Sequence, residues 1–323
     1  MYSNKEVNNN PSELTEKEVR YLSKFDYKTS NIYGLPKVHR SEIINEALRS
    51  QKTEVITVLK PADLKLRPII AGPICPTHRL SHFIDIILQP LAAQVNSYVR
   101  DNFDVLLKIP TEIDEDMIAA TFDVENLYGS ITHDVGLEAI HFWLNKQPQD
   151  SFRFSNEFII SSIKIILENN IFQFDGHFYK QLKGTAMGTK MAPIYATLTL
   201  GYLELKLSAT IQNHFSNAIY NNFRKFYFRY LDDILIFFKT SELSIEEISN
   251  LLNEMNNNIK FQLESSGSKI NFLDIQILIN EGKVETDMYC KSTDTKQYLN
   301  FSRTIPDILN ELYPTILHAE FAA

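Results

Sequence analysis

The chain has 323 residues, of which 44% are hydrophobic, and its formal net charge is −8. This length and apolar fraction permit a sizeable core shared among two or three subdomains, as in a globular enzyme. The chain has neither a signal peptide nor an apolar run near the roughly 18 residues of a transmembrane helix, so a soluble intracellular protein without a membrane partner is expected, nuclear or cytoplasmic.

The acidic excess is distributed unevenly along the chain. Residues 16–108 contain 14 Lys or Arg against 10 Asp or Glu, whereas residues 109–175 contain 3 against 12. A net negative charge is unusual for a protein that grips nucleic acid, because phosphate neutralisation needs Lys and Arg. A mildly basic region followed by an acidic, cation-requiring region is still compatible with such a protein, with weak or salt-sensitive template binding.

The first third of the chain predicts a leader and a mixed subdomain. Residues 1–15 are polar and Asn-rich, which is typical of a disordered leader. Pro68 restrains Arg67 to an extended backbone, which favours a strand. Residues 78–100 have the apolar spacing of an amphipathic helix, with a bend at Pro90. Residues 112–116 form an acidic linker.

The middle of the chain predicts a strand, two helices and a hairpin. The apolar run 117–122 predicts a strand with Asp123 at or near its end, followed by Val124. Thr132 and Ser155 are helix N-cap signals, for helices running to residues 146 and 170. Residues 172–179, with Asp-Gly at the centre, predict a hairpin.

The segment GTAMGTKMAP, residues 184–193, predicts a close backbone approach followed by a helix. Gly184 and Gly188 allow the backbone to come near a bound base or primer–template. Pro193 suits the first turn of a helix over residues 194–207. Met187 lies between the two glycines.

Residues 226–239, FYFRYLDDILIFFK, predict a β-hairpin with Asp232 and Asp233 at its tip. Two acids at the end of an apolar hairpin indicate a compensating cation, because an unpaired buried charge is costly. The alternative is that Asp-Asp simply forms a turn. If the Asp123 strand lies beside this hairpin, the carboxylates can bridge two divalent ions, and oxygen ligands favour Mg²⁺. Cys75 and Cys290 are isolated and form neither a zinc site nor a disulfide framework.

The last third of the chain predicts a helix and several short strands. Ser244 begins a helix, and turns are expected at residues 265–268 and 281–282. Lys269 is either a general acid for a leaving group or an exposed turn residue. Alternating helices and antiparallel hairpins predict an α+β fold, with a sheet covered by helices on one face.

Five motifs occur in the order found in reverse transcriptases: YGLPKVHR (33–40), LRPIIAGP (66–73), DVENLY (123–128), GTAMGTKMAP (184–193) and YLDD (230–233). Of these, YGLPKVH and GTAMG, together with INFLDI (270–275), resemble most the reverse transcriptases of Penelope-like retroelements, which are relatives of telomerase reverse transcriptase. The resemblance covers residues 33–302.

The resemblance implies a right-hand polymerase, with fingers at 16–110, an antiparallel palm sheet within 111–302, and a truncated thumb remnant or tail at 303–323. Penelope-like proteins typically continue into a helical thumb, and many carry a GIY-YIG endonuclease. The chain is therefore expected to be part of a longer polyprotein, a degenerate copy, or a core that borrows a thumb.

The resemblance also implies the roles of individual residues. Catalysis is assigned to Asp123, Asp232 and Asp233, and binding of two Mg²⁺ ions, with Mn²⁺ as a substitute, to Asp123, Val124 and Asp232. The nucleotide contacts are Lys65, Arg67, Tyr128 and Met187, although many reverse transcriptases have Gln where Met187 stands. The template and primer contacts are Gly184, Gly188 and Tyr230. Asp274 is assigned a structural role between palm and thumb.

Two functions follow from the resemblance. The first is an RNA-directed DNA polymerase that uses an RNA template, a DNA or RNA primer and dNTPs, with Tyr128 excluding ribonucleotides. The second is a catalytically silent palm that serves as a nucleic-acid-binding or interaction module. An RNA-dependent RNA polymerase is disfavoured by the aromatic ring of Tyr128.

Overall fold

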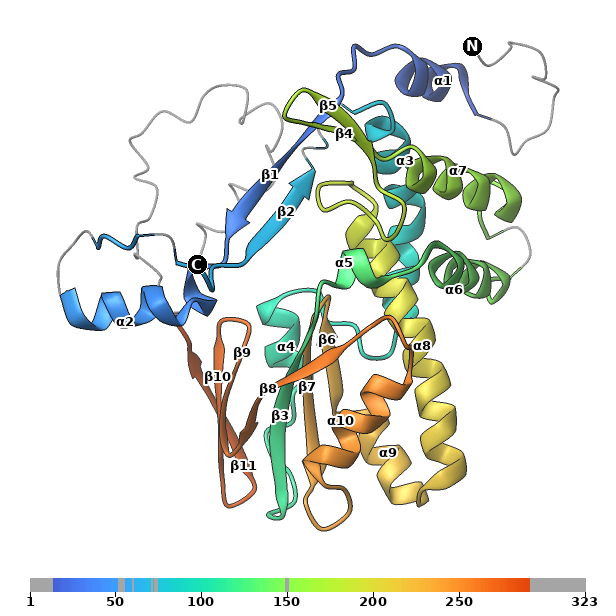
Figure 1. Ribbon diagram of the computed structural model, residues 1–323. Coiled ribbons are helices and arrows are strands. Elements are labelled where there is room, and N and C mark those ends of the chain that lie inside the picture. Colours follow the sequence, from blue (N-terminus) through green and yellow to red (C-terminus); the bar gives the residue numbers. More distant parts are fainter. Residues whose placement is uncertain are drawn as a thin grey trace, which may run out of the picture. The chain divides into compact units, whose positions relative to one another are not determined.

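The computed structural model describes residues 14–51, 56–59, 61–70, 72, 75–148 and 151–290 (Figure 1). The fold below is that of the unit Met1–Tyr289. Most of the predicted leader, the end of the predicted palm and the predicted tail at 303–323 lie outside the described residues.

A four-stranded antiparallel sheet forms the centre of this unit. Its strands are β6 (Tyr227–Tyr230), β7 (Asp233–Lys239), β3 (Met117–Val124) and β8 (Phe261–Gly267), in the order β6-β7-β3-β8. The predicted hairpin is confirmed, because β6 and β7 pair around a two-residue turn. The predicted strand at 117–122 is also confirmed, and it pairs directly with β7.

The two faces of this sheet pack against different partners. On one face, Phe122 and Ile236 join a core with the helices α8 (Ala192–His214), α9 (Asn217–Phe226) and α10 (Ile245–Glu254), so the predicted helical cover on one face is confirmed (Figure 1). On the other face, Ala119 and Leu235 join a second core. That core includes α4 (Asn102–Lys108) and a small sheet of β9 (Lys269–Phe272), β10 (Ile275–Asn280) and β11 (Lys283–Met288).

A second four-stranded sheet has the order β2-β1-β4-β5. Its strands are β1 (Ser30–Pro36), β2 (Leu66–Ile70), β4 (Ile171–Phe174) and β5 (His177–Lys180). The predicted Asp-Gly hairpin is confirmed, with φ of +48° at Asp175 and +75° at Gly176, as a type I′ turn requires. The strands β1 and β2 are antiparallel, and Leu35 pairs with Arg67.

The remaining helices frame these sheets. Their bounds are α1 (Glu16–Ser23), η1 (Val38–Arg40), α2 (Glu42–Gln51), α3 (His78–Leu88), η2 (Gln89–Gln94), α5 (Leu127–Ser130), α6 (His133–Asn145) and α7 (Asn156–Glu168). The predicted start signals are confirmed, since Thr132 and Ser155 are N-cap residues, although only the Ser155 side chain accepts a capping hydrogen bond. Across the described ranges, no helix combines the length and apolarity needed to span a bilayer.

Three predicted boundaries are wrong. The helix expected over 78–100 ends at Leu88 and continues only as a 3₁₀ turn through Pro90, because the following segment pairs with β6 through Ser97 and Val99. The turn expected at 265–268 is mostly part of β8, whose pairing with β3 resumes after a register shift beside Thr121. Helix α8 is longer than predicted, because Ile211 is also buried in the core.

Candidate active site

Three carboxylates lie at one end of the central sheet. Asp123 is near the end of β3, Asp233 is the first residue of β7 and pairs with it across the ladder, and Asp232 lies in the turn before β7. The Val124 N–H donates a hydrogen bond of 3.0 Å to the Asp232 carbonyl, which attaches this turn to β3. Asp123 is 9% exposed, whereas the other two acids are half-buried. The fold thus brings together acids that are far apart in the sequence.

Asp232, the acid in the turn, lies where its ionised form is disfavoured. Burial raises the pKa of Asp232, and the negative charge of Asp123 raises it further. A hydrogen bond with its own backbone and the positive charges of Arg67 and Lys37 oppose this rise. A cation beside the two carboxylates would relieve both their desolvation and their repulsion.

Arg40, at the end of η1, contacts the carboxylates directly. Its Nη2 donates to Oδ2 of Asp123 over 2.8 Å and to Oε1 of Glu264 over 3.1 Å. The hydrogen bond to Asp123 raises the pKa of Arg40. The sequence placed Arg40 within a fingers motif but did not identify it as a site residue. Its partners lie on β3 and β8, far away in the sequence, and no residue near the motif indicates them.

Lys37 is a second site residue that sequence reasoning missed. Burial lowers the pKa of Lys37, and the positive charges of Arg40 and Arg67 add to this effect. The carboxylates of Asp123 and Asp232 act in the opposite direction. The sequence feature that could have identified Lys37 is its position in the motif YGLPKVHR. Three basic side chains therefore act electrostatically on the carboxylate cluster.

Arg67 and Lys65, the two basic residues predicted to contact the nucleotide, differ in their relation to the carboxylates. Arg67 lies on β2, as predicted for a strand-borne phosphate contact, and its charge acts on Lys37, Tyr128 and Asp232. Lys65 is exposed just before β2, and its carbonyl accepts a hydrogen bond of 2.8 Å from the Lys37 N–H. The structure therefore ties Arg67, rather than Lys65, to the carboxylates.

Tyr128, in the short helix α5, lies close to the same acids. Burial raises its pKa to about 12, and the charges of Asp232 and Tyr230 contribute in the same direction. Its carbonyl accepts a hydrogen bond of 2.8 Å from Thr185 N–H. At Gly184, with φ of +76°, a Cβ would lie 2.4 Å from the Tyr128 carbonyl oxygen, so this glycine allows a close contact between two backbone segments of the protein itself.

The other half of the glycine segment contacts the end of β2. Ile70 N–H donates a hydrogen bond of 3.0 Å to the Met187 carbonyl. At Gly188, with φ of +113°, a Cβ would lie 2.3 Å from the Ile70 carbonyl oxygen, and one at Gly72 would lie 2.3 Å from the Gly188 oxygen. The segment 184–188 is therefore held between α5 and β2.

The oxygen donors of this cluster suit a hard divalent cation. In the part of the chain that the structure describes, no group of three or more His, Cys, Asp or Glu side chains is arranged to hold a metal ion. Asp123, Asp232 and the backbone carbonyl of Val124 would thus need water or substrate oxygens to complete a coordination shell. Such incomplete protein shells are usual for Mg²⁺.

Two further predicted residues lie away from the carboxylates. Lys269 is exposed at the start of β9. Asp274 accepts a hydrogen bond of 3.0 Å from Asn102 Nδ2, and its carbonyl accepts one of 2.8 Å from Tyr289 N–H. Asp274 therefore connects the turn after β9 with α4 and with the chain following β11, which agrees with a structural role.

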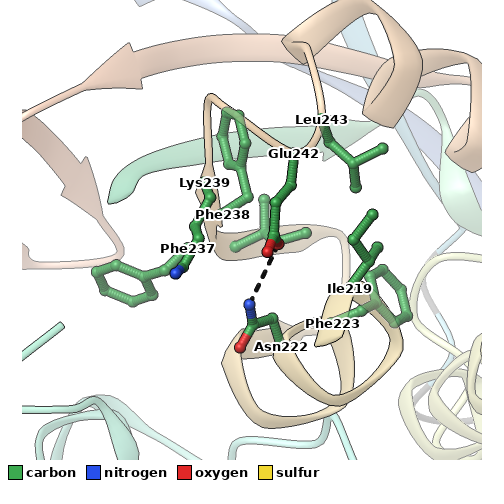
Figure 2. Close-up of a pocket in the computed structure, with 9 residues that line it drawn as sticks. Ile219, Asn222, Phe223, Phe237, Phe238, Lys239, Glu242 and Leu243 are labelled. Carbon is green, nitrogen blue, oxygen red and sulfur yellow. Dashed lines mark hydrogen bonds between the residues drawn. The ribbon is translucent and has the colours of Figure 1, made fainter. Parts of the chain in front are cut away.

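A small pocket lies at the opposite end of β7 and is not part of this site. It is lined mainly by apolar side chains of α9 and of β7, with Asn222 hydrogen-bonded to Glu242 over 3.4 Å (Figure 2). It has room for about one water molecule. The candidate chemistry therefore lies at the carboxylate end of the sheet.

The sequence matches one family of known proteins. Residues 58–299 match the family model described as reverse transcriptase (RNA-dependent DNA polymerase). A search of curated proteins gave no significant match.

Solved structures resemble the fold. Telomerase from Candida tropicalis in complex with a fragment of telomeric RNA has a TM-score of 0.54 at 12% identity, covering 85% of this chain and 47% of that one. Apo telomerase from C. tropicalis, truncated from its C-terminal domain, has a TM-score of 0.51 at 12% identity, covering 76% and 60%. The RNA-dependent RNA polymerase of a human picobirnavirus has 0.51 at 11%, covering 77% and 43%.

This chain thus spans about half the length of the structures that it resembles. The likeness shows a mixed α+β fold with antiparallel sheets, similar to the fingers and palm of polymerases. Because the family model matches most of the sequence, the chain belongs to the reverse transcriptase (RNA-dependent DNA polymerase) family.

Proposed function

We propose that this protein is an RNA-directed DNA polymerase of a retroelement, which adds deoxynucleoside monophosphates to a primer 3′-hydroxyl on an RNA template. The observation that carries the proposal is the convergence of Asp123, Asp232 and Asp233 at one end of the sheet, with the charges of Arg40 and Lys37 acting on them. A phosphoryl-transfer site needs this combination of anionic metal ligands and cationic phosphate contacts.

The proposed cofactor is a pair of Mg²⁺ ions, which Mn²⁺ can replace. Asp123, Asp232 and the Val124 carbonyl would hold them, with Asp233 in support. When bound, the ions supply charge neutralisation for the attacking and leaving oxygens of an in-line displacement. The ion pair between Arg40 and Oδ2 of Asp123 engages one carboxylate oxygen in the described contacts.

The other predicted residues receive roles that fit their positions. Arg67 and Lys37 would bind the triphosphate, since their charges already act on the carboxylates. Lys65 would act at longer range from its exposed position. The Tyr128 ring would pack beneath the sugar and leave no room for a 2′-hydroxyl, and Met187 would pack against the nucleotide.

The template and primer would lie along the glycine segment and the end of β6. Gly184 and Gly188 allow this segment to pack closely against the backbones of Tyr128 and Ile70, and the segment fixed in this way would lie beside the nascent base pair. Tyr230 ends the strand before the acidic turn. The fingers (16–110), palm (111–302) and thumb remnant or tail (303–323) remain proposed divisions. Together with INFLDI, the fingers motif YGLPKVHR supports membership of the Penelope-like group. A thumb and an endonuclease would then be partners supplied by a longer polyprotein.

The activity test is primer extension on an RNA template with dNTPs and Mg²⁺ or Mn²⁺. We expect extension by the wild type and a loss of at least about 1,000-fold in Asp232→Asn, because the amide removes a charged metal ligand. The control Asp287→Asn makes the same change at an exposed carboxylate on β11 and should retain full activity. Folded wild-type protein that binds template but never extends the primer would contradict the proposal and favour the silent module.

Asp232→Asn should also stabilise the metal-free protein. A carboxyl whose pKa is raised in the folded state is stabilising below its unfolded pKa, and this contribution is lost as the pH rises through the folded pKa. The variant should therefore have a higher Tm than the wild type at neutral pH with EDTA. The difference should shrink as the pH falls towards about 4 and should vanish well below the ordinary Asp pKa of about 3.9, where the acid is protonated in both states. An equal or lower Tm of the variant at neutral pH would show that Asp232 is not electrostatically strained.

Sugar selection depends on the Tyr128 ring in this proposal. Tyr128→Ala should lower the preference for dNTPs over rNTPs by about 100-fold or more, since a steric exclusion is removed. Tyr128→Phe keeps the ring and should keep the preference. Competition between dNTP and rNTP in primer extension measures this ratio, and unchanged selectivity in Tyr128→Ala would refute the steric role.

A further inference from the structure

A fully buried ion pair lies beneath the acidic turn. Arg229 on β6 is 0% exposed, and Glu204 on α8 is 8% exposed. The Arg229 guanidinium binds both oxygens of Glu204, through Nε to Oε1 and through Nη2 to Oε2. Glu204 also accepts a hydrogen bond from the Ser97 hydroxyl. Because burying both charges is costly, such a pair is weak evidence that it stabilises the fold. A role in positioning neighbouring groups is the alternative.

The remaining donors of Arg229 contact backbone carbonyls on two different elements. Nη2 donates to the Thr197 carbonyl of α8 over 3.1 Å, and Nη1 donates to the Leu231 carbonyl over 3.3 Å. The Arg229 backbone is paired with the segment 97–99 as well, through the Ser97 carbonyl and the Val99 N–H. Arg229 is thus immobilised by α8 and by this segment, and its free end reaches the turn.

The residue that it reaches has a strained backbone. Leu231 has φ of +51°, in the left-handed region that non-glycine residues seldom occupy. Such a conformation persists only where surrounding contacts enforce it. Here the Leu231 carbonyl accepts from Arg229, and the next carbonyl, that of Asp232, accepts from Val124 N–H. The turn is therefore fixed from α8 on one side and from β3 on the other.

We propose that the Arg229–Glu204 pair is a positioning device, which holds Leu231 in the left-handed conformation and thereby directs Asp232 towards Asp123. The Arg229 guanidinium donates to Glu204 and to the Thr197 and Leu231 carbonyls, so it acts on Asp232 through the turn. The catalytic part of this inference rests on the proposed polymerase function, whereas its structural part does not.

The test replaces the whole pair with apolar side chains of similar length. In Arg229→Met/Glu204→Met neither charge is left buried alone, so the fold is expected to survive. The control Lys206→Met/Glu138→Met removes an exposed ion pair between α8 and α6, with side chains 55% and 56% exposed. Thermal unfolding and amide hydrogen exchange are measured for both variants and the wild type.

We expect a Tm close to that of the wild type in both variants, with faster exchange of the 227–235 peptide only in Arg229→Met/Glu204→Met. This readout requires no enzymatic activity. Exchange equal to that of the wild type in a folded variant would overturn the proposal. If this variant does not fold, Arg229→Lys is compared in the same assay, because it keeps a cation beside Glu204 but lacks the guanidinium arm that donates to the Leu231 carbonyl. Unchanged exchange of the turn in that variant would overturn the proposal equally.

The kinetic test uses primer extension with the same variants. We expect kcat of Arg229→Met/Glu204→Met to fall about tenfold or more with KM for dNTP nearly unchanged, since only the alignment of Asp232 is lost. Adding Leu231→Gly should restore part of kcat, because glycine adopts positive φ without strain. An unchanged kcat would overturn the catalytic part. An inactive wild type would refute the polymerase proposal itself, and the exchange result alone would then decide the role of the pair.

Discussion

The antiparallel pairing of β3 with β7 is the constraint on which the rest of the site depends. Its register places Asp123 opposite Asp233, and the turn that begins β7 adds Asp232. A shift of one residue would turn every side chain of a strand to the other face. Such a shift is opposed on both faces, because Phe122 belongs to the helical core and Leu235 to the core beneath the small sheet. Ordinary apolar packing therefore fixes the position of the acids.

The local distribution of charge, rather than the net charge, makes an acidic chain compatible with the proposed phosphate substrate. The strands β1 and β2 with η1 bring Lys37, Arg40 and Arg67 into electrostatic contact with the carboxylates. The segment between Gly184 and Gly188 joins the end of β2 to α5, through backbone contacts that leave no space for a Cβ. Carboxylates and basic side chains thus meet in one place, as the proposed phosphoryl transfer requires, although the whole chain carries a charge of −8.

Local patterns predicted the elements of this site but not its long-range contacts. The alternating apolar runs around Asp123 and Asp232 predict their strands, and Asp175 with Gly176 predicts a hairpin, because each signal lies within a few residues. The contact of Arg40 with Asp123 crosses 83 positions, so no local pattern could indicate it. The same holds for the Arg229–Glu204 pair, which reads in sequence as one residue of a strand and one of a helix.

The most direct test of the metal site is localised cleavage of the backbone by bound iron. Fe²⁺ replaces Mg²⁺ at oxygen-rich sites, and with ascorbate and peroxide it generates hydroxyl radicals that cut the chain near the ion. The account predicts cuts near both Asp123 and Asp232, suppressed by excess Mg²⁺ and lost in Asp123→Asn. Cuts confined to other segments, or an unchanged pattern in Asp123→Asn, would contradict a metal site built from β3 and the β6–β7 turn.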